Sequence, residues 1–127
     1  MEACRNKGIH TAIESSVYCE IETISRFIEV VDLFIVDLKI FSQMQHIHYT
    51  GKSNNIIKEN IRYIVESDKD ILVRVPMVEN ITDSDENLDS IRSFINGMNN
   101  RIPIEYLSFN PLVENNYKRL GIPFLLK

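Results

Sequence analysis

The stretch Asp32-Leu33-Phe34-Ile35-Val36-Asp37-Leu38-Lys39 is a short apolar run that ends in charged residues. Its β-branched and aromatic residues are typical of a buried strand. Successive side chains of a strand point to opposite faces, so Asp37 and Lys39, two residues apart, lie on the same side of the backbone. Because ligands of α/β folds bind outside the carboxyl ends of the strands, we expect the binding site beside these two residues.

Strands and helices alternate through the rest of the chain. Apolar runs predict further strands, and apolar stripes at helical spacing predict the helices between them. The predicted strands are 9–14, 33–38, 71–75 and 104–109, and the predicted helices are 20–31, 56–65 and 83–98, with a short helical segment from Glu114. Strands separated by helices favour parallel pairing with right-handed crossovers, and therefore an α/β sheet or part of a β/α barrel.

The ends of these helices carry capping residues. Ser53 to Asn55 precede the stripe of helix 56–65 and can cap it. Asp83 with Glu86 three residues later predicts a capping box at the start of helix 83–98, and Gly97 with Asn99 predicts its end. No repeat, linker or low-complexity segment divides the chain, so we expect residues 1–127 to form a single domain.

Composition and charge exclude several classes of protein. The chain has 127 residues, of which 44% are hydrophobic and 25% are charged, as in soluble globular domains. No apolar run has the length that a bilayer requires. The net charge is −4 and the pI is near 5.3, whereas phosphate binding needs a basic stripe. We therefore expect neither a membrane nor a nucleic acid among the partners.

The cysteines indicate a reducing compartment. Cys4 and Cys19 are the two cysteines of the chain, and they lie too far apart for a metal or redox pair of short spacing. The sequence has no signal-peptide pattern before them. We expect reduced thiols and a cytoplasmic protein.

Polar residues stand where the predicted strands end. They are Glu14-Ser15-Ser16, Asp37 with Lys39, Arg74 and Asn110. If the strands are parallel, these residues share one rim of the sheet. Individually, each also has an ordinary interpretation as a cap, a turn former or half of a surface ion pair. Arg74 lies between two valines, and a guanidinium in such a strand is costly unless an anion or a carboxylate meets it.

Two further motifs give weaker patterns. His46 and His48 are two residues apart, but without a third ligand nearby a solvated or hydrogen-bonded role is favoured over a metal site. Gly51-Lys52-Ser53 is similar to the end of a phosphate loop, but the earlier glycine of such a loop is absent. We assign neither motif to a site.

Several segments, read in order, carry a family resemblance. They are 8–16, 31–39, 49–54, 73–76, 83–87 and 115–123. Together they resemble the glycyl-radical-enzyme activating enzymes, of which the pyruvate formate-lyase activating enzyme is the best-known member. The resemblance covers nearly the whole chain. It implies an incomplete, open β/α barrel, similar to part of a TIM barrel, with parallel strands.

The resemblance also implies an activity. In this family the barrel binds S-adenosylmethionine against a [4Fe-4S] cluster. One-electron reduction of the sulfonium yields a 5′-deoxyadenosyl radical, which takes a hydrogen from a glycine of the partner enzyme. The implied partner is therefore a glycyl radical enzyme such as pyruvate formate-lyase.

The matching positions imply ligand contacts. Asp37 and Lys39 match an Asp-x-Lys element beside the ribose and carboxylate of S-adenosylmethionine, and Arg74 matches a strand arginine at the same ligand. Asn110 stands where several members have a histidine near the adenosyl group.

A monovalent-cation site is implied as well. Glu14 and Ser15 match an acid and a hydroxyl residue of that site, which is shared with Asp37.

The chain departs from the family pattern in its cysteines. The family holds three irons of the cluster with Cys-x3-Cys-x2-Cys, and Cys4 and Cys19 do not supply this spacing. We therefore expect a C-terminal portion of such an enzyme, without cluster ligands and inactive alone. The alternatives are a stand-alone binding or assembly module whose cluster-bearing part is another polypeptide, and an unrelated α/β ligand-binding domain. An incomplete barrel also leaves open strand edges, so self-association is a further expectation.

Overall fold

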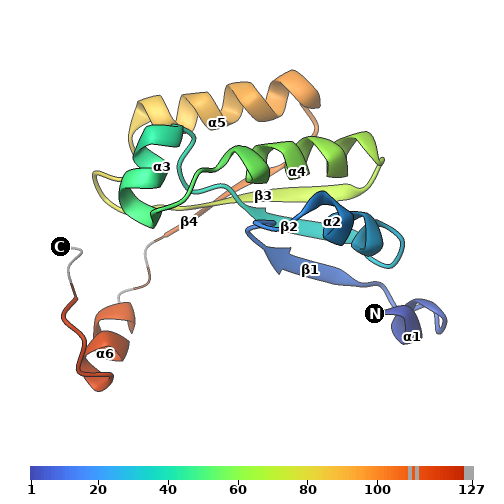
Figure 1. The fold of residues 1–127 in the computed structure, drawn as a ribbon, viewed down its shortest axis with the longest axis horizontal. Coiled ribbons are helices and arrows are strands. Elements are labelled where there is room, and N and C mark those ends of the chain that lie inside the picture. The colour runs from blue at the N-terminus through green and yellow to red at the C-terminus, as the bar shows by residue number, and fades with distance from the viewer. Residues whose placement is uncertain (109, 111, 125–127) are drawn as a thin grey trace.

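The computed structural model describes residues 1–108, 110 and 112–124. Within this part of the chain, four parallel strands form one sheet in the order β1-β2-β3-β4 (Figure 1). The strands are β1 (Ala12–Ser15), β2 (Leu33–Asp37), β3 (Asp70–Pro76) and β4 (Ile104–Leu107). The helices are α1 (Glu2–Arg5), α2 (Ile21–Ile28), α3 (Gln43–Thr50), α4 (Asn55–Glu66), α5 (Asp85–Met98) and α6 (Leu112–Arg119).

The helices between strands lie on one side of the sheet. Figure 1 shows α2, α3, α4 and α5 above it, while α1 and α6 lie below it at its two ends. We call the side under α2 to α5 the covered face and the other side the open face. Sequential strand order with the connecting helices on one face is the winding of a β/α barrel, whereas doubly wound sheets carry helices on both faces. The prediction of an open, parallel α/β fold is confirmed.

The hydrophobic core lies between the covered face and the helices. Alternate residues of β2 and β3 supply the sheet side of this core: Phe34, Val36, Ile71, Val73 and Val75. The helix side comes from the apolar stripes of α2, α4 and α5: Ile24, Ile57, Ile61, Ile64, Leu88, Ile91 and Ile95. Burying each such side chain contributes about 1.5 to 3 kcal/mol, so this layer supplies most of the stability.

The open face alternates apolar and charged residues. The intervening residues of β2 and β3, which include Ile35, Asp37, Leu72 and Arg74, are half-buried. The register aligns Asp37 with Arg74 and Arg74 with Glu105 across β2, β3 and β4. A row of charges therefore crosses the open face near the carboxyl ends of the strands.

The element boundaries differ from the predicted ones at three places. The predicted strand 9–14 begins at Ala12, because the Ile9 N–H bonds back to the Cys4 carbonyl (3.0 Å) at the end of α1. Helix α5 begins after Ser84, whose hydroxyl accepts from the Asn87 N–H (3.3 Å), so the predicted capping box at Asp83 is wrong. β4 ends at Leu107, and Phe109, in the predicted strand 104–109, lies outside the described residues.

Helix α3 is absent from the predicted elements. Its residues include no clear apolar stripe, which is why periodicity misses it. Its ends are nevertheless encoded, because the Ser42 hydroxyl accepts from the Gln45 N–H (3.4 Å) and Gly51 follows with φ of 72°. A serine N-cap followed by a glycine in the left-handed conformation is a recognisable helix start and stop.

Candidate functional site

Asp37 and Lys39 lie together at the carboxyl end of β2. The Lys39 Nζ donates to Asp37 Oδ2 at 2.8 Å, and the two side chains are 23% and 43% exposed for Asp37 and Lys39 respectively. The predicted position of both groups on one side of the strand is therefore confirmed. The ion pair leaves the carboxylate and the ammonium accessible to a ligand.

Arg74 meets carboxylates on both sides, as its apolar neighbours require. Its Nε donates to Glu105 Oε2 at 2.6 Å, and its Nη1 lies 2.9 Å from Glu14 Oε2. The hydrogen bond to Glu105 raises the pKa of Arg74, while burial opposes this rise and Glu14 adds to it. The three side chains connect β1, β3 and β4 over the open face. Glu105 was not among the predicted site residues, although its place between Ile104 and Tyr106 puts it on the same face as Arg74.

Glu14, Ser15 and Asp37, the predicted cation ligands, each have protein partners. Glu14 pairs with Arg74, Asp37 pairs with Lys39, and the Ser15 hydroxyl accepts from the Val17 N–H at 3.0 Å. Strand alternation also directs Ser15 to the face opposite Glu14. The monovalent-cation site stays a prediction, and binding there requires the carboxylates to exchange their present partners.

Asn110 follows β4 at the same end of the sheet. Its side chain is exposed, and Oδ1 accepts from the Leu112 N–H at 3.0 Å, next to the start of α6. This contact is the ordinary capping role of an asparagine. A ligand contact by Asn110 stays a prediction.

A pocket of about 340 Å³ opens beside the ion pair of Asp37 and Lys39. Residues from β2, from α3, from α4 and from the loops after β1, β2 and α3 line it: Ser16, Tyr18, Asp37, Lys39, His46, Thr50, Lys52 and Ile57. The lining thus combines hydroxyls, an imidazole, a carboxylate and lysine amines over an apolar base. This is the composition of a site for a small polar ligand.

Buried asparagines hold the loops that form this rim. The Asn60 amide donates to the carbonyls of Val17 and Cys19, both at 2.8 Å. The Asn54 amide donates to the carbonyls of Ile40 (2.8 Å) and Phe41 (2.9 Å). These amides come from the covered side of the sheet and fix the backbone that follows β1 and β2.

Asn87 completes this support from helix α5. Its amide donates to the Lys39 carbonyl (3.0 Å) and the Thr82 carbonyl (2.8 Å), and its Oδ1 accepts from the Phe41 N–H (2.8 Å). Neither Asn60 nor Asn87 is among the residues predicted for the site. Helical periodicity was the available signal, because Asn60 shares a stripe with Ile57, Ile61 and Ile64, as Asn87 does with Leu88 and Ile91.

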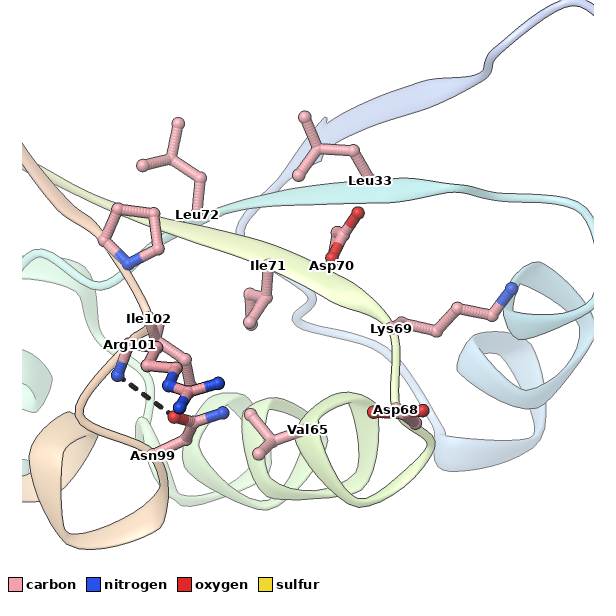
Figure 2. A pocket seen from close by; sticks show the side chains of 11 residues that line it. Leu33, Val65, Asp68, Lys69, Asp70, Ile71, Leu72, Asn99, Arg101 and Ile102 are labelled. Atoms are coloured by element: carbon pink, nitrogen blue, oxygen red, sulfur yellow. Dashed lines mark hydrogen bonds between the residues drawn. The ribbon is translucent and has the colours of Figure 1, made fainter.

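A larger pocket, of about 540 Å³, lies at the opposite edge of the sheet. Figure 2 shows it at the amino ends of the strands, with Leu33 and Leu72 on one side of β3 and Ile71 and Val65 on the other. The Asn99 side chain accepts from the Arg101 N–H (3.0 Å) at its rim. Active sites of β/α barrels lie at the carboxyl ends of the strands instead, so the smaller pocket, beside Asp37 and Lys39, is the better candidate for the functional site.

Metal and membrane features are limited in the part of the chain that the structure describes. There, no group of three or more histidine, cysteine, aspartate or glutamate side chains is placed to hold a metal ion. His46 is buried and His48 is exposed, so the two histidines of α3 diverge. No helix of the described ranges has the length and apolarity to cross a bilayer.

Comparisons with known proteins identify the relatives of this singly wound parallel α/β sheet. No protein-family model matches the chain. The chain is 34% identical over 128 residues to the (2S)-3-sulfopropanediol dehydratase activating enzyme of Klebsiella oxytoca. The alignment covers 99% of the chain and 40% of that enzyme. The chain is 35% identical over 120 residues to the 4-hydroxyphenylacetate decarboxylase activating enzyme of Clostridioides difficile strain 630, covering 93% of the chain and 38% of the enzyme.

A solved structure has the same fold. It is a domain of the pyruvate-formate lyase-activating enzyme from Bacteroides vulgatus ATCC 8482, with a TM-score of 0.76 and 22% identity, covering 94% of this chain and 80% of that one. The chain is therefore a homologue of the glycyl-radical-enzyme activating enzymes, as the sequence motifs predicted. It spans about two fifths of the length of these two curated relatives.

The residues present do not fit an iron–sulfur cluster. Such clusters need several thiolates. Cys4 is exposed on α1, and burial raises the pKa of the half-buried Cys19 thiol, with a smaller contribution from Glu20. The donor set of Asp37, Lys39 and the pocket hydroxyls does fit S-adenosylmethionine, which carries hydroxyl, amino and carboxylate groups.

Proposed function

We propose that this chain is part of an activating enzyme that cleaves S-adenosylmethionine reductively and generates a glycyl radical on a partner enzyme. The chain's relatives include activating enzymes at 29% to 37% identity. The observation that carries the proposal is the accessible ion pair of Asp37 and Lys39, which lines a pocket at the carboxyl ends of parallel strands. The partner class is a glycyl radical enzyme such as pyruvate formate-lyase, and the compartment is the cytoplasm.

In this proposal the rim residues hold S-adenosylmethionine. Asp37 accepts hydrogen bonds from ribose hydroxyls, Lys39 and Arg74 bind the carboxylate, and Asn110 lies by the adenosyl group. When bound, S-adenosylmethionine supplies the carbon–sulfur bond that is broken to start the radical reaction. The work of these side chains is to orient the ligand, because Asp37 accepts and Lys39 donates at fixed positions on a rigid strand end.

The cation site is a separate part of the proposal. Glu14 and Asp37 would bind a monovalent cation once Arg74 and Lys39 turn to the ligand, and Ser15, whose side chain lies on the opposite face, would have to turn towards them. In this exchange the cation takes the place of the two basic side chains beside Glu14 and Asp37.

We propose that the [4Fe-4S] cluster is bound outside these 127 residues, since Cys4 and Cys19 do not provide its ligands. The chain alone is then inactive. Anaerobic reconstitution followed by iron and sulfide quantitation tests this statement: we expect no stoichiometric loading, and four irons per chain would contradict it.

Isothermal titration of S-adenosylmethionine into the chain tests the ligand site. Asp37→Asn removes the charge at nearly constant shape, and Lys39→Met removes the ammonium while keeping the length. Each substitution should weaken binding about tenfold or more, because each deletes a charged hydrogen-bonding partner. Asp89→Asn is the matched control, since Asp89 pairs with Arg92 on α5, away from the pocket. Wild-type affinity in Asp37→Asn and Lys39→Met would refute the site.

A second candidate function is a stand-alone binding or assembly module whose cluster-bearing part is a separate chain. It is favoured by the continuous core between the sheet and α2, α4 and α5, which stabilises one domain over most of the chain. β1 and β4 are edge strands of the described sheet, so self-association through them is a further part of this proposal. Size-exclusion chromatography with light scattering separates the cases: a monomer that binds S-adenosylmethionine supports the module, and oligomers without binding oppose it.

A further inference from the structure

His46 is a buried polar residue with an unexplained position. The residue is 6% exposed, and it lines the pocket beside Asp37 and Lys39. Helix α3 carries it there, although the sequence alone gave His46 no role. Buried polar groups are almost always hydrogen-bonded, so each nitrogen of this ring needs an account.

The first nitrogen, Nδ1, belongs to a closed network. Nδ1 lies 2.7 Å from the Lys52 carbonyl oxygen and 3.0 Å from Thr50 Oγ1. A carbonyl oxygen only accepts, so Nδ1 carries the proton and donates it. The Thr50 hydroxyl donates to the His46 carbonyl (2.6 Å), so towards Nδ1 and the Lys52 N–H (3.2 Å) it acts as an acceptor. This network fixes one tautomer of the neutral ring and leaves Nε2 as a hydrogen-bond acceptor.

The second nitrogen, Nε2, has no hydrogen-bond partner within the described ranges. In that same part of the chain, the enclosed side-chain atom without a partner is Asn54 Oδ1. His46 Nε2 is therefore not enclosed, and it borders open space. Because His46 lines the pocket and Nδ1 is taken up by the Lys52 carbonyl, Nε2 is the ring nitrogen that remains for a ligand.

The charges around this acceptor define the ligand class. The amines of Lys39 and Lys52 line the pocket with the carboxylate of Asp37, so one positive charge is left over when the imidazole is neutral. Amines of this kind bind a carboxylate. An acceptor nitrogen and a carboxylate bind hydroxyl or amino donors. The pocket thus suits a ligand that carries a carboxylate together with hydroxyl or amino groups.

We infer that His46 and Lys52 contact the ligand of this pocket directly: Nε2 of His46 accepts from a hydroxyl or amino group, and Lys52 binds the carboxylate beside Lys39. The inference rests on the proposed function, because S-adenosylmethionine has all these groups. It makes α3 and the Gly51-Lys52-Ser53 turn part of the binding site. Backbone atoms of that turn select the tautomer of His46, and the side chain of Lys52 meets the ligand.

Two substitutions at His46 separate ligand binding from folding. His46→Asn places an amide nitrogen near the position of Nδ1, so it keeps the bond to the Lys52 carbonyl and removes Nε2. His46→Gln places an amide oxygen near the position of Nε2, so it keeps the acceptor and loses the bond to the backbone. For S-adenosylmethionine we expect His46→Asn to bind about tenfold more weakly and His46→Gln within about threefold of wild type. Thermal unfolding should rank them the other way, with His46→Gln the less stable variant.

If His46 has a purely structural role, His46→Asn binds S-adenosylmethionine with wild-type affinity and His46→Gln binds it more weakly. That result overturns the inference. If His46→Asn does not fold, Lys52→Ala decides, because Lys52 is exposed and its carbonyl is retained. Lys52→Ala should bind S-adenosylmethionine about threefold or more weakly, while Lys7→Ala, an exposed lysine outside the pocket, should match wild type. Equal affinities for these two variants overturn the inference. Absence of binding by the wild-type chain is the distinct failure of the proposed function, and the inference falls with it.

Discussion

The two faces of the sheet are built from the same strands but have different chemistry. On the covered face Phe34, Val36 and Val73 are at most 1% exposed and belong to the hydrophobic core. On the open face the intervening positions hold the Asp37 carboxylate and the Arg74 guanidinium, both in ion pairs. Because a strand alternates its side chains, one short segment serves stability on one face and ligand binding on the other.

The comparison also shows how the faces are coupled. Buried amides on the covered side, above all Asn87, bond to the backbone that carries Lys39 on the open side. The rim loops are therefore held by groups that never reach the ligand. The site should be sensitive to substitutions in the core, while the core should be much less sensitive to substitutions in the site.

The largest expected effect is the loss of a core side chain. Phe34→Ala should lower the free energy of unfolding by about 3 to 5 kcal/mol, because it leaves a cavity between β2 and the helices. Its neighbour on the open face gives the matched variant, and Ile35→Ala should cost about 1 to 2 kcal/mol because Ile35 is half-buried. Urea unfolding followed by circular dichroism measures both. Equal losses would mean that the two faces do not differ as described.

Asn87→Ala should have the next largest effect. It leaves the Phe41 N–H and the Lys39 and Thr82 carbonyls without their partner, at a cost of about 2 to 3 kcal/mol. Urea unfolding gives the loss, and hydrogen exchange should show faster opening in the loop after β2. Asn99→Ala removes one exposed contact and should change stability by less than about 0.5 kcal/mol. A stable Asn87→Ala with an unchanged loop would break the coupling between the faces.

Arg74→Lys should separate binding from stability. A lysine keeps the charge but cannot make the forked contacts to Glu14 and Glu105. S-adenosylmethionine should bind about threefold to tenfold more weakly in calorimetry. The urea midpoint should move far less than in Phe34→Ala, since the carboxylate partners are half-exposed or more. A large loss of stability would instead mean that Arg74 and its partners Glu14 and Glu105 serve mainly to stabilise the fold.

The smallest effect is a pH dependence at the amino end of the sheet. Hydrogen bonds from the Thr11 N–H (2.7 Å) and the Thr11 hydroxyl (3.0 Å) lower the pKa of Asp32 below its ordinary value of 3.8. A lowered pKa in the folded state adds stability above pH 3.8, and this stability is lost as the pH falls from 3.8 through the folded-state pKa. Urea midpoints of wild type and Asp32→Asn should therefore differ at neutral pH and converge in acid. A constant difference would contradict the assignment.

Local patterns were sufficient for some features of the site. The contact of Asp37 with Lys39 follows from strand alternation, which depends on two residues of one strand. The need of Arg74 for a carboxylate followed from its apolar neighbours alone. Its partners, Glu14 on β1 and Glu105 on β4, did not follow, since they depend on the order of the strands in the sheet and on their register.

Other features of the site depend on contacts between two motifs, each of which is weak evidence by itself. His46 and the Gly51-Lys52-Ser53 turn each gave a weak pattern, and the fold joins them through the bond from His46 Nδ1 to the Lys52 carbonyl. Helix α3, which carries His46, has no apolar stripe that periodicity could detect. The support by Asn60 and Asn87 could not be predicted, because their partners in the loops after β1 and β2 lie more than forty positions away in the chain.

By itself the sequence determined the alternation of strands and helices, the apolar alternate positions of the core and the charged end of β2, because each depends on spacing within a few residues. Tertiary structure alone decided which carboxylates meet Arg74, which loops the buried amides hold and which nitrogen of His46 is left for a ligand. Those outcomes depend on strand order, register and helix docking, which bring together residues far apart in the chain, such as Lys39 and Asn87 with a separation of 48.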